Sequence, residues 1–399
     1  MPSPGAVRND APPLLVTELM PPADVSRMPE IAQASSPPAA GASVWENPTW
    51  SREDRPVPGA HTVRADLASS ATVQPIARAS EPGIPVLCYH HVFADGGDMD
   101  GFNIRPERFE EQLRYLNEQG YQSIRQEQLI AYMLGRTVTL PAKPILITFD
   151  DGSLSNYTEV APLLARYDFN AVLFLYPTII SASRSRYMNW RQVQELVRSG
   201  RFEVASHTLW HPMLPAMDRR GIRDQLERSK RILEANLNTT VRMIAYPFGV
   251  YDRRVIEEAR AVGYELGFTI QPGGNRSGDE PLTMNRYMVT SGHSLQVFAS
   301  SLRLQSPNQL RIEPSDGASV RAGQSIRLTL GGVRPDSVRL SVAGHAVRLT
   351  EGGGTFSGAI PAFSSTRGYL PVVIRATGAG GAHLYQEFLY LDGARFTGD

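Results

Sequence analysis

Short apolar runs alternate with helix-like segments between about residues 84 and 300. Continuous apolar runs of strand length are typical of strands buried on both faces of a parallel sheet. Two of the intervening segments, Pro106–Gly120 and Ile222–Leu237, carry apolar residues at helical spacing. This order of elements predicts one α/β domain that forms a barrel or a distorted barrel. The apolar runs are IPVLCY, PILITF, AVLFLY, FEVAS, VRMIAY and LGFTI.

A different pattern extends from about residue 306 to 395. Runs such as QSIRLTL and SVRLSVAG alternate apolar and polar positions, and Gly, Asp, Ser and Pro separate them. Alternation with a period of two indicates strands with one buried face, and the turn residues indicate antiparallel connections. The segment therefore predicts a small accessory β-sandwich of immunoglobulin-like type.

Residues 1 to 80 have neither pattern and are rich in Pro, Ala and Ser. Such a segment buries too little apolar surface to offset the entropy of ordering, so we predict a disordered tail. The first 22 residues also lack the basic start and apolar centre of a secretory signal. Either the protein is not exported by that route, or its signal is missing from this sequence.

Composition narrows the classes of function. The chain has 399 residues, enough for two or three domains, and its 40 Lys and Arg residues balance 40 Asp and Glu residues. No bulk charge therefore favours nucleic acid or an anionic membrane. No apolar run approaches the roughly 18 residues that a transmembrane segment needs. The single cysteine, Cys88, excludes an intrachain disulfide framework, and we expect it to be a small buried strand residue.

Two adjacent carboxylates, Asp150 and Asp151, follow the apolar run that ends at Phe149. Like charges at this spacing cost free energy unless a cation or a shared proton relieves them. His207 and His211 follow a later predicted strand, and a helix there would bring both imidazoles to one face. Two imidazoles and one carboxylate form the three-ligand arrangement of catalytic zinc. Taken singly, the motifs also fit solvated histidines and an ordinary Asp-Gly turn.

Other polar groups also end predicted strands. His90 and His91 end the first apolar run, and ligands of parallel α/β folds gather at the carboxyl ends of strands. We therefore expect His90 to face the same side as the two aspartates, and His91 to face the opposite side. The segment from Tyr246 to Gly249 forms a predicted turn whose backbone N–H groups can point into the site. A hydrogen-bonded strand-end histidine and a simple turn are the alternatives.

The motifs TFDDG, SHTLWHP and YPFG, in this order, resemble those of the NodB-type polysaccharide deacetylases, which are metal-dependent carbohydrate esterases. The start PVLCYHHV, placed before TFDDG, resembles the circularly rearranged branch that includes poly-N-acetylglucosamine deacetylases. In that branch the catalytic histidine motif lies at the amino end of the domain. The resemblance covers about residues 84 to 292 and implies a distorted (β/α) barrel for residues 84–300. It leaves out the tail and the sandwich.

The resemblance also implies roles for the motif residues. Asp151, His207 and His211 are implied to hold a divalent metal, with Zn²⁺ favoured. Asp150 is implied to be the general base that activates water. His90 is implied to protonate the leaving amine.

The YPFG turn is implied to contact the substrate. The backbone N–H of Phe248 is expected to hold the oxyanion, and Tyr246 belongs to the same turn. The family usually has an arginine two residues before the proline of this turn, where it orients the base, but here Ala245 occupies that position. Arg286 is a candidate replacement, with a surface ion pair as the alternative. Weaker candidates for substrate contacts are Asn156, Tyr157, Trp190 and Trp210.

The implied reaction is metal-dependent removal of the N-acetyl group from N-acetylglucosamine residues of a polysaccharide, which releases acetate. A poly-N-acetylglucosamine-like polymer is favoured, and a peptidoglycan or chitin-oligosaccharide deacetylase is the alternative in the same class. A non-catalytic polysaccharide-binding protein is the alternative in another class, and Ala245 favours it. The expected partner is the N-acetylated polysaccharide, without nucleic acid, and protein partners are unknown. The family's substrates imply an extracytoplasmic location, in the periplasm or at the cell envelope.

Overall fold

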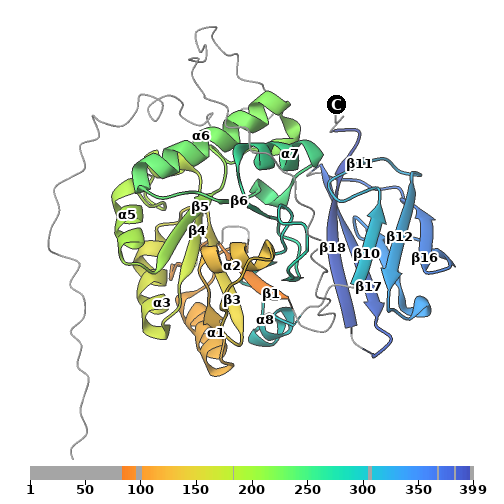
Figure 1. The fold of residues 1–399 in the computed structure, drawn as a ribbon, viewed down its shortest axis with the longest axis horizontal. Coiled ribbons are helices and arrows are strands. Elements are labelled where there is room, and N and C mark those ends of the chain that lie inside the picture. Colours follow the sequence, from red (N-terminus) through yellow and green to blue (C-terminus); the bar gives the residue numbers. More distant parts are fainter. Residues whose placement is uncertain are drawn as a thin grey trace, which may run out of the picture.

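An α/β unit is followed by a strand-rich unit in the computed structural model (Figure 1). The expected mixed α/β fold with a parallel sheet, followed by an all-β part, is therefore confirmed. The predicted disordered tail, residues 1–80, lies outside the described residues. The domain limits 84–300 and 306–395 remain a proposal. The structure describes residues 83–95, 101–182, 184–303, 308–365, 368–381 and 383–395.

One curled, mainly parallel sheet organises the α/β unit. Its strands follow the order β7-β6-β5-β4-β3-β1-β8, while β2 pairs with β3 and β9 pairs with β1. Strand β1, the first in the chain, lies directly beside β3, so their carboxyl ends are neighbours. The strands are β1 (Ile84–Tyr89), β2 (Gln122–Ser123), β3 (Pro144–Asp150), β4 (Ala171–Leu175), β5 (Phe202–Ser206), β6 (Met243–Ala245), β7 (Leu266–Phe268), β8 (Gly274–Asn275) and β9 (Tyr287–Met288).

A late segment of the chain connects the two ends of this row of strands. The Arg286 N–H donates to the Gln271 carbonyl just beyond β7, at 2.9 Å. Three residues later, the Val289 N–H donates to the Cys88 carbonyl in β1, also at 2.9 Å. These bonds link the β7 side of the sheet to β1 and give it a barrel-like curl. They also place Arg286 between the two ends of the sheet.

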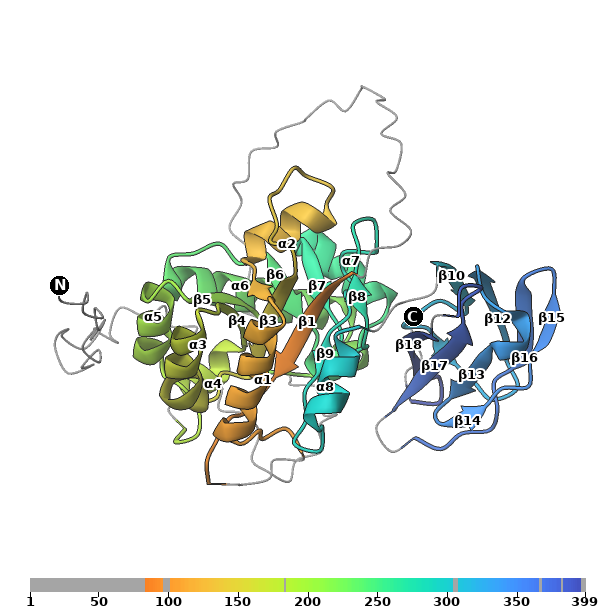
Figure 2. The same ribbon diagram turned by 90° about the horizontal axis from the view of Figure 1, so that it is seen from below.

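Helices cover the outside of the curled sheet (Figures 1 and 2). Both helices predicted from apolar spacing are present, as α1 and α6. Helix α1 has Pro106 in its first turn, and α6 is capped by Asp218, whose carboxylate accepts a bond from the Gly221 N–H. The helices are α1 (Pro106–Glu118), α2 (Gln126–Met133), α3 (Ala161–Tyr167), α4 (Pro177–Ser181), α5 (Trp190–Arg198), α6 (Arg219–Leu237), α7 (Arg253–Val262) and α8 (Leu295–Ser301).

The two faces of the sheet have different cores. Alternate residues of β3 belong to different buried clusters. Ile147 and Phe149 belong to the large cluster, and Leu146 belongs to a smaller cluster that it shares with residues of β1, β4, β5, β6, β7 and α2. This alternation follows from the period of two of an extended strand. It places Thr148 and Asp150 on the same face as Leu146. None of the helices in the described ranges has both the length and the apolar character of a membrane-spanning helix.

The strand-rich unit consists of two sheets with a shared buried core. One sheet has the order β10-β12-β16-β15 and the other β11-β18-β17-β13-β14. Strand β12 shows the predicted alternation, since Ile326, Leu328 and Leu330 are buried while Ser325 and Arg327 are exposed. The strands are β10 (Asn308–Glu313), β11 (Ser319–Val320), β12 (Ser325–Gly331), β13 (Arg339–Val342), β14 (His345–Ala346), β15 (Thr350–Gly352), β16 (Thr355–Ala359), β17 (Tyr369–Thr377) and β18 (His383–Asp392).

Candidate active site

Strand alternation brings the polar groups of β1 and β3 together. Cys88 pairs with Thr148 in parallel register. Two residues farther along the chain, His90 and Asp150 therefore lie on the same side. Cys88, His90 and Asp150 each have a polar or sulfur atom within 4.8 Å of the other two. The structure thus brings the candidate acid close to the candidate base.

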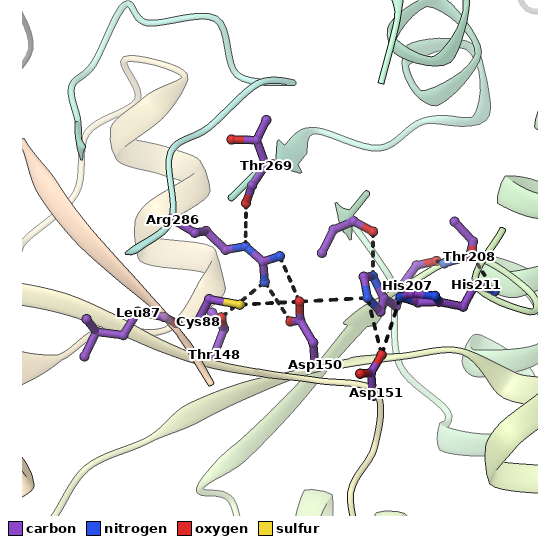
Figure 3. Close-up of polar contacts among 12 residues, drawn as sticks. Leu87, Cys88, Thr148, Asp150, Asp151, His207, Thr208, His211, Thr269 and Arg286 are labelled. Carbon is purple, nitrogen blue, oxygen red and sulfur yellow. Dashed lines mark hydrogen bonds and ion pairs between the residues drawn. The ribbon is translucent and has the colours of Figure 1, made fainter. Parts of the chain in front are cut away.

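Asp150 is held by a buried guanidinium. Arg286 Nη1 donates to Asp150 Oδ1 at 2.7 Å and Nη2 to Oδ2 at 2.8 Å (Figure 3). Arg286 is 0% exposed and Asp150 2% exposed, so water does not screen this pair. Burial by itself raises the pKa of Asp150, but the charge and the hydrogen bonds of Arg286 act in the opposite direction, and that pKa lies well below its ordinary value.

The position of Arg286 excludes the surface ion pair, which was the alternative for this residue. Its Nε also donates to the Thr269 carbonyl at 2.8 Å, which fixes the guanidinium from behind (Figure 3). Ala245 is fully buried among the apolar residues of the smaller cluster. Ala245 stands where the family usually has an arginine. In this structure the guanidinium beside Asp150 comes instead from Arg286, in the segment that links the β7 side of the sheet to β1.

Asp151 points away from this pair because the chain turns sharply at the end of β3. Asp151 has a φ of 71° and Gly152 a φ of 75°, both in the left-handed region. The positive φ of Gly152 favours glycine, and a Cβ atom there would lie 2.6 Å from Ile180 Cδ1, so the Ile180 side chain would have to move. The turn directs the Asp151 carboxylate toward two histidines: Oδ1 lies 3.6 Å from both His207 Nε2 and His211 Nε2.

The histidines converge without the expected helix. The residues from His207 to the short 3₁₀ turn Leu214–Ala216 form an irregular loop, so the helix suggested by the four-residue spacing is wrong. Pro212 follows His211 directly, and proline disfavours a helical conformation in the residue before it. Instead, Thr208 and His211 adopt left-handed φ values of 68° and 63°. The two rings lie edge to face with centroids 4.6 Å apart.

A backbone carbonyl sets the tautomer of His207. His207 Nδ1 lies 2.8 Å from the Ala245 carbonyl oxygen, which can only accept, so Nδ1 carries the proton. The lone pair on Nε2 then faces Asp151. Metal-ligating histidines usually donate the N–H of their other ring nitrogen in this way. The bond fixes the ring orientation and leaves Nε2 unprotonated for a metal.

The three groups fit a divalent metal. One atom each of Asp151, His207 and His211 lies within 4.8 Å of the other two. Asp151 Oδ1 is buried and has no hydrogen-bond partner in the described part of the chain, which is costly unless a cation lies beside it. Zinc bonds of about 2.0–2.1 Å in a tetrahedron hold ligand atoms about 3.3 Å apart, close to the observed separation. Burial lowers the pKa of His211 to about 4, which keeps it in the neutral, metal-binding form.

The two adjacent histidines of β1 have different surroundings. The His90 ring stacks on Phe102 at a centroid distance of 4.8 Å, and burial lowers the pKa of His90 below its ordinary value. His91 is 4% exposed, and burial lowers its pKa to about 4.

The turn Pro247–Gly249 lies against the histidine loop. Phe248 has φ 60° and ψ 8°, is 47% exposed, and contacts the His211 ring edge-on at 4.7 Å. The backbone bonds of the turn come from the Gly249 and Val250 N–H groups, so they leave the Phe248 N–H out. Tyr246 is a correction: it is fully buried and its hydroxyl donates to the Leu282 carbonyl at 2.9 Å, so its side chain does not face a substrate.

The side chains of three weaker candidates are hydrogen-bonded within the α/β unit or buried. Trp190 begins α5 and its Nε1 donates to Ser181 Oγ at 3.0 Å, as expected of a packing residue. The Tyr157 hydroxyl, which was expected to reach a substrate, instead donates to Glu195 in α5 at 2.6 Å. Asn156 is fully buried.

Two neighbours of the site were not predicted. The Tyr176 ring lies 5.4 Å from the His211 ring, and Cys88 Sγ lies 3.5 Å from Asp150 Oδ2. Both could have been found from strand pattern, because Tyr176 ends the apolar run AVLFLY and Cys88 precedes His90 by two residues on one strand face.

Part of the chain is similar to known proteins. Residues 137–267 match the family model described as Polysaccharide deacetylase. The chain is 25% identical over 217 residues to YxkH of Bacillus subtilis (strain 168), which spans 54% of this chain and 75% of that relative. It is also 25% identical over 262 residues to the poly-beta-1,6-N-acetyl-D-glucosamine N-deacetylase of Escherichia coli (strain K12). That match spans 55% of this chain and only 38% of the relative.

A solved structure shares the fold. The deacetylase PplD of Streptococcus pyogenes, in complex with acetate, superimposes with a TM-score of 0.52 at 23% sequence identity. The match covers 56% of this chain and 99% of that chain. At this sequence identity, the match supports a common fold alone.

Proposed function

We propose that this chain hydrolyses the N-acetyl groups of N-acetylglucosamine residues in a polysaccharide and releases acetate, since residues 137–267 match the polysaccharide deacetylase family model. One observation carries the proposal. Asp151 lies with two imidazoles in a possible metal-ligand set, and the adjacent Asp150 forms an ion pair with a buried arginine. A protein that only binds sugar has no use for a buried ionised carboxylate, whose desolvation is costly. The arrangement therefore favours an enzyme over a non-catalytic polysaccharide-binding protein.

In the proposed site, Asp151, His207 and His211 hold a divalent metal, with zinc as the first choice because the set combines two imidazoles and one carboxylate. A metal bound there supplies Lewis-acid polarisation of the acetamide carbonyl and lowers the pKa of water. The proton transfers and the binding of the oxyanion are proposed to be carried out by side chains and a backbone N–H of this chain.

Asp150 is proposed to take a proton from the attacking water. Arg286 holds both oxygens of Asp150, so the carboxylate is ionised and fixed in one orientation before the substrate binds. The Phe248 N–H is proposed to donate to the oxygen on which negative charge develops. His90, close to Asp150, is proposed to deliver a proton to the nitrogen of the departing amine. Water and the amide are thereby converted into acetate and a free amino sugar.

The favoured substrate is a poly-β-1,6-N-acetylglucosamine-like polymer, because the Escherichia coli relative bears that name. A peptidoglycan or a chitin oligosaccharide is the alternative. Because polysaccharides of this kind occur outside the cytoplasm, we propose an extracytoplasmic location, in the periplasm or at the cell envelope.

Acetate release tests the proposal directly. The purified protein is stripped of metal, supplied with zinc, and incubated with β-1,6-linked and β-1,4-linked N-acetylglucosamine oligomers. We expect acetate only after zinc is added, and faster release from the β-1,6-linked series. Asp150→Asn should bind zinc normally but release acetate about 10²–10⁴ times more slowly, since that is the usual contribution of a general base. Zinc binding by the wild type without acetate from any oligomer would favour the binding protein instead.

A further inference from the structure

The strand-rich unit contacts the α/β unit next to the candidate metal site. A separate buried apolar cluster, here called the interdomain cluster, consists of Val250, Leu389 and Leu391, with Met213 and Tyr369 packed against it. Leu389 and Leu391 belong to β18, which lies on the side of the strand-rich unit nearest the α/β unit in both views (Figures 1 and 2). Val250 is fully buried, and Leu391 is 1% exposed.

The α/β residues of this cluster belong to the two loops that carry site groups. Met213 follows His211 by two residues, and Val250 follows Phe248 by two residues. His211 and Phe248 are also in direct contact through their rings, with centroids 4.7 Å apart. The interdomain cluster therefore holds both loops close to the point where they meet.

A polar contact joins the same two units. Asp316, between β10 and β11, accepts a bond from the Leu389 N–H at 2.8 Å through Oδ1. Its other oxygen accepts from the hydroxyl of Tyr251, which is fully buried. Gln271 Nε2 also donates to this hydroxyl oxygen at 3.3 Å. Asp316 thus connects β18 to the residue that follows Val250.

The backbones of the two units approach closely at this contact. Gly317 has a φ of +78°, and a Cβ atom there would lie 3.0 Å from the Tyr251 carbonyl oxygen and 3.2 Å from Asp252 Cα. A side chain at this position would be strained by the positive φ, and the backbone of Tyr251 and Asp252 would have to shift by a few tenths of an ångström. The close approach leaves little freedom for the segment around Tyr251.

The site needs such support because its loops have unfavourable backbone conformations. His211 and Phe248 both have left-handed φ values, 63° and 60°, although neither is a glycine. Bulky residues stay in this region only where surrounding contacts hold them there. The interdomain cluster and the Asp316–Tyr251 bond are contacts of this kind. The strand-rich unit, which provides Asp316, Leu389 and Leu391 for them, contributes no predicted ligand or catalytic group.

We propose that the strand-rich unit is a positioning element of the metal site: through Asp316 and the interdomain cluster, it holds the loops that carry His211 and Phe248 in their ligand-ready conformation. This inference rests on the proposed metal site, because its consequence is tighter metal binding. Asp316 and Tyr251 are positioning residues, since they act through the loops and not on a substrate.

Substitutions of Asp316 in the full chain test this role. Asp316→Ala removes both acceptor oxygens, whereas Asp316→Asn keeps an oxygen for the Leu389 N–H and a polar partner for Tyr251. Ile374→Val is the matched control, because it removes one methylene from the core of the strand-rich unit without touching the interdomain contact. The measurements are amide hydrogen exchange in peptides covering residues 207–213 and 247–251, and zinc affinity by competition with a coloured chelator.

We expect Asp316→Ala to accelerate exchange in both peptides and to weaken zinc binding about 10–100-fold, the usual effect of losing a group that supports a ligand. Asp316→Asn should restore most of both properties, and Ile374→Val should change neither. Unchanged exchange in Asp316→Ala, unchanged zinc affinity despite faster exchange, or an equal loss in Ile374→Val would overturn the inference. Zinc binding by the wild type without acetate release would contradict the proposed function but not this inference, since neither measurement depends on turnover.

Discussion

Replacing Arg286 with methionine removes the only guanidinium bonded to Asp150 among the described residues and keeps a long side chain in its place. The two residues share two hydrogen bonds, of 2.7 and 2.8 Å, and are at most 2% exposed. In the variant, the Asp150 carboxylate stays buried without this cation. Methionine adds no donor that could replace the lost bonds.

The expected loss of stability is large. Removing one partner of a buried ion pair costs about 3–5 kcal/mol, because the remaining charge keeps its desolvation penalty without the compensating attraction. For a unit of 150–250 residues, each kcal/mol shifts the melting temperature by about 2–4 °C. Arg286→Met should therefore lower the melting temperature of the α/β unit by roughly 6–20 °C at neutral pH.

The loss should depend on pH in a defined direction. In the wild type, the pKa of Asp150 is held well below its ordinary value, so the ionised carboxylate contributes stability above the unfolded pKa of about 3.9. That contribution disappears only as the pH falls through the lower folded pKa. In Arg286→Met, burial dominates and raises the pKa of Asp150, so the carboxyl is protonated more readily. The difference in melting temperature should therefore shrink as the pH is lowered from 7 toward about 4.

Calorimetry of a small set of variants tests this reasoning. Arg260→Met is the matched control, because its ion pair with Glu280 at 3.0 Å is about half exposed and should contribute no more than about 1 kcal/mol. The double variant Arg286→Met, Asp150→Leu should regain much of the lost stability, since it removes both charges, but it should release no acetate. If Arg286→Met is no less stable than Arg260→Met, the buried pair does not have the energetic role argued here.

Three further outcomes are expected. His211→Ala should lose bound zinc on dialysis while Asp150→Asn keeps it, as measured by metal content; equal retention would contradict the ligand assignment. A chelator should lower the melting temperature of the zinc-loaded wild type, because zinc at about 1,000 times its dissociation constant stabilises by about 4 kcal/mol, and Asp151→Asn should show a much smaller shift. Asp218→Ala should cost about 1 kcal/mol, since the Asp218 carboxylate caps α6 through the Gly221 N–H at 2.7 Å; a change below a few tenths would mean that water replaces the cap.

Local pattern in the sequence was enough to predict many of the strands and helices and to suggest the chemistry. Continuous apolar runs marked the buried parallel strands, and helical spacing marked α1 and α6. Strand alternation places His90 and Asp150 on one side, as the sequence suggested, because a period of two is a property of any extended chain. The residue types Asp, Asp, His and His were sufficient to suggest a metal beside a base.

Features that depend on distant parts of the chain were decided by the tertiary structure. Whether Arg286 reaches Asp150, 136 residues away, depends on how the closing segment joins the two ends of the sheet. The meeting of His207 and His211 depends on left-handed turns instead of the suggested helix, and Tyr246 faces the core because its hydroxyl finds the Leu282 carbonyl.

The contact between Asp316 and Tyr251 had no signal in the sequence at all. Periodicity reports which face of an element is buried, but it does not report which other element covers that face. Pairings between distant residues follow from the curl of the sheet and from the fit of one unit on another. These are properties of the whole chain, so they can only be read from its three-dimensional structure.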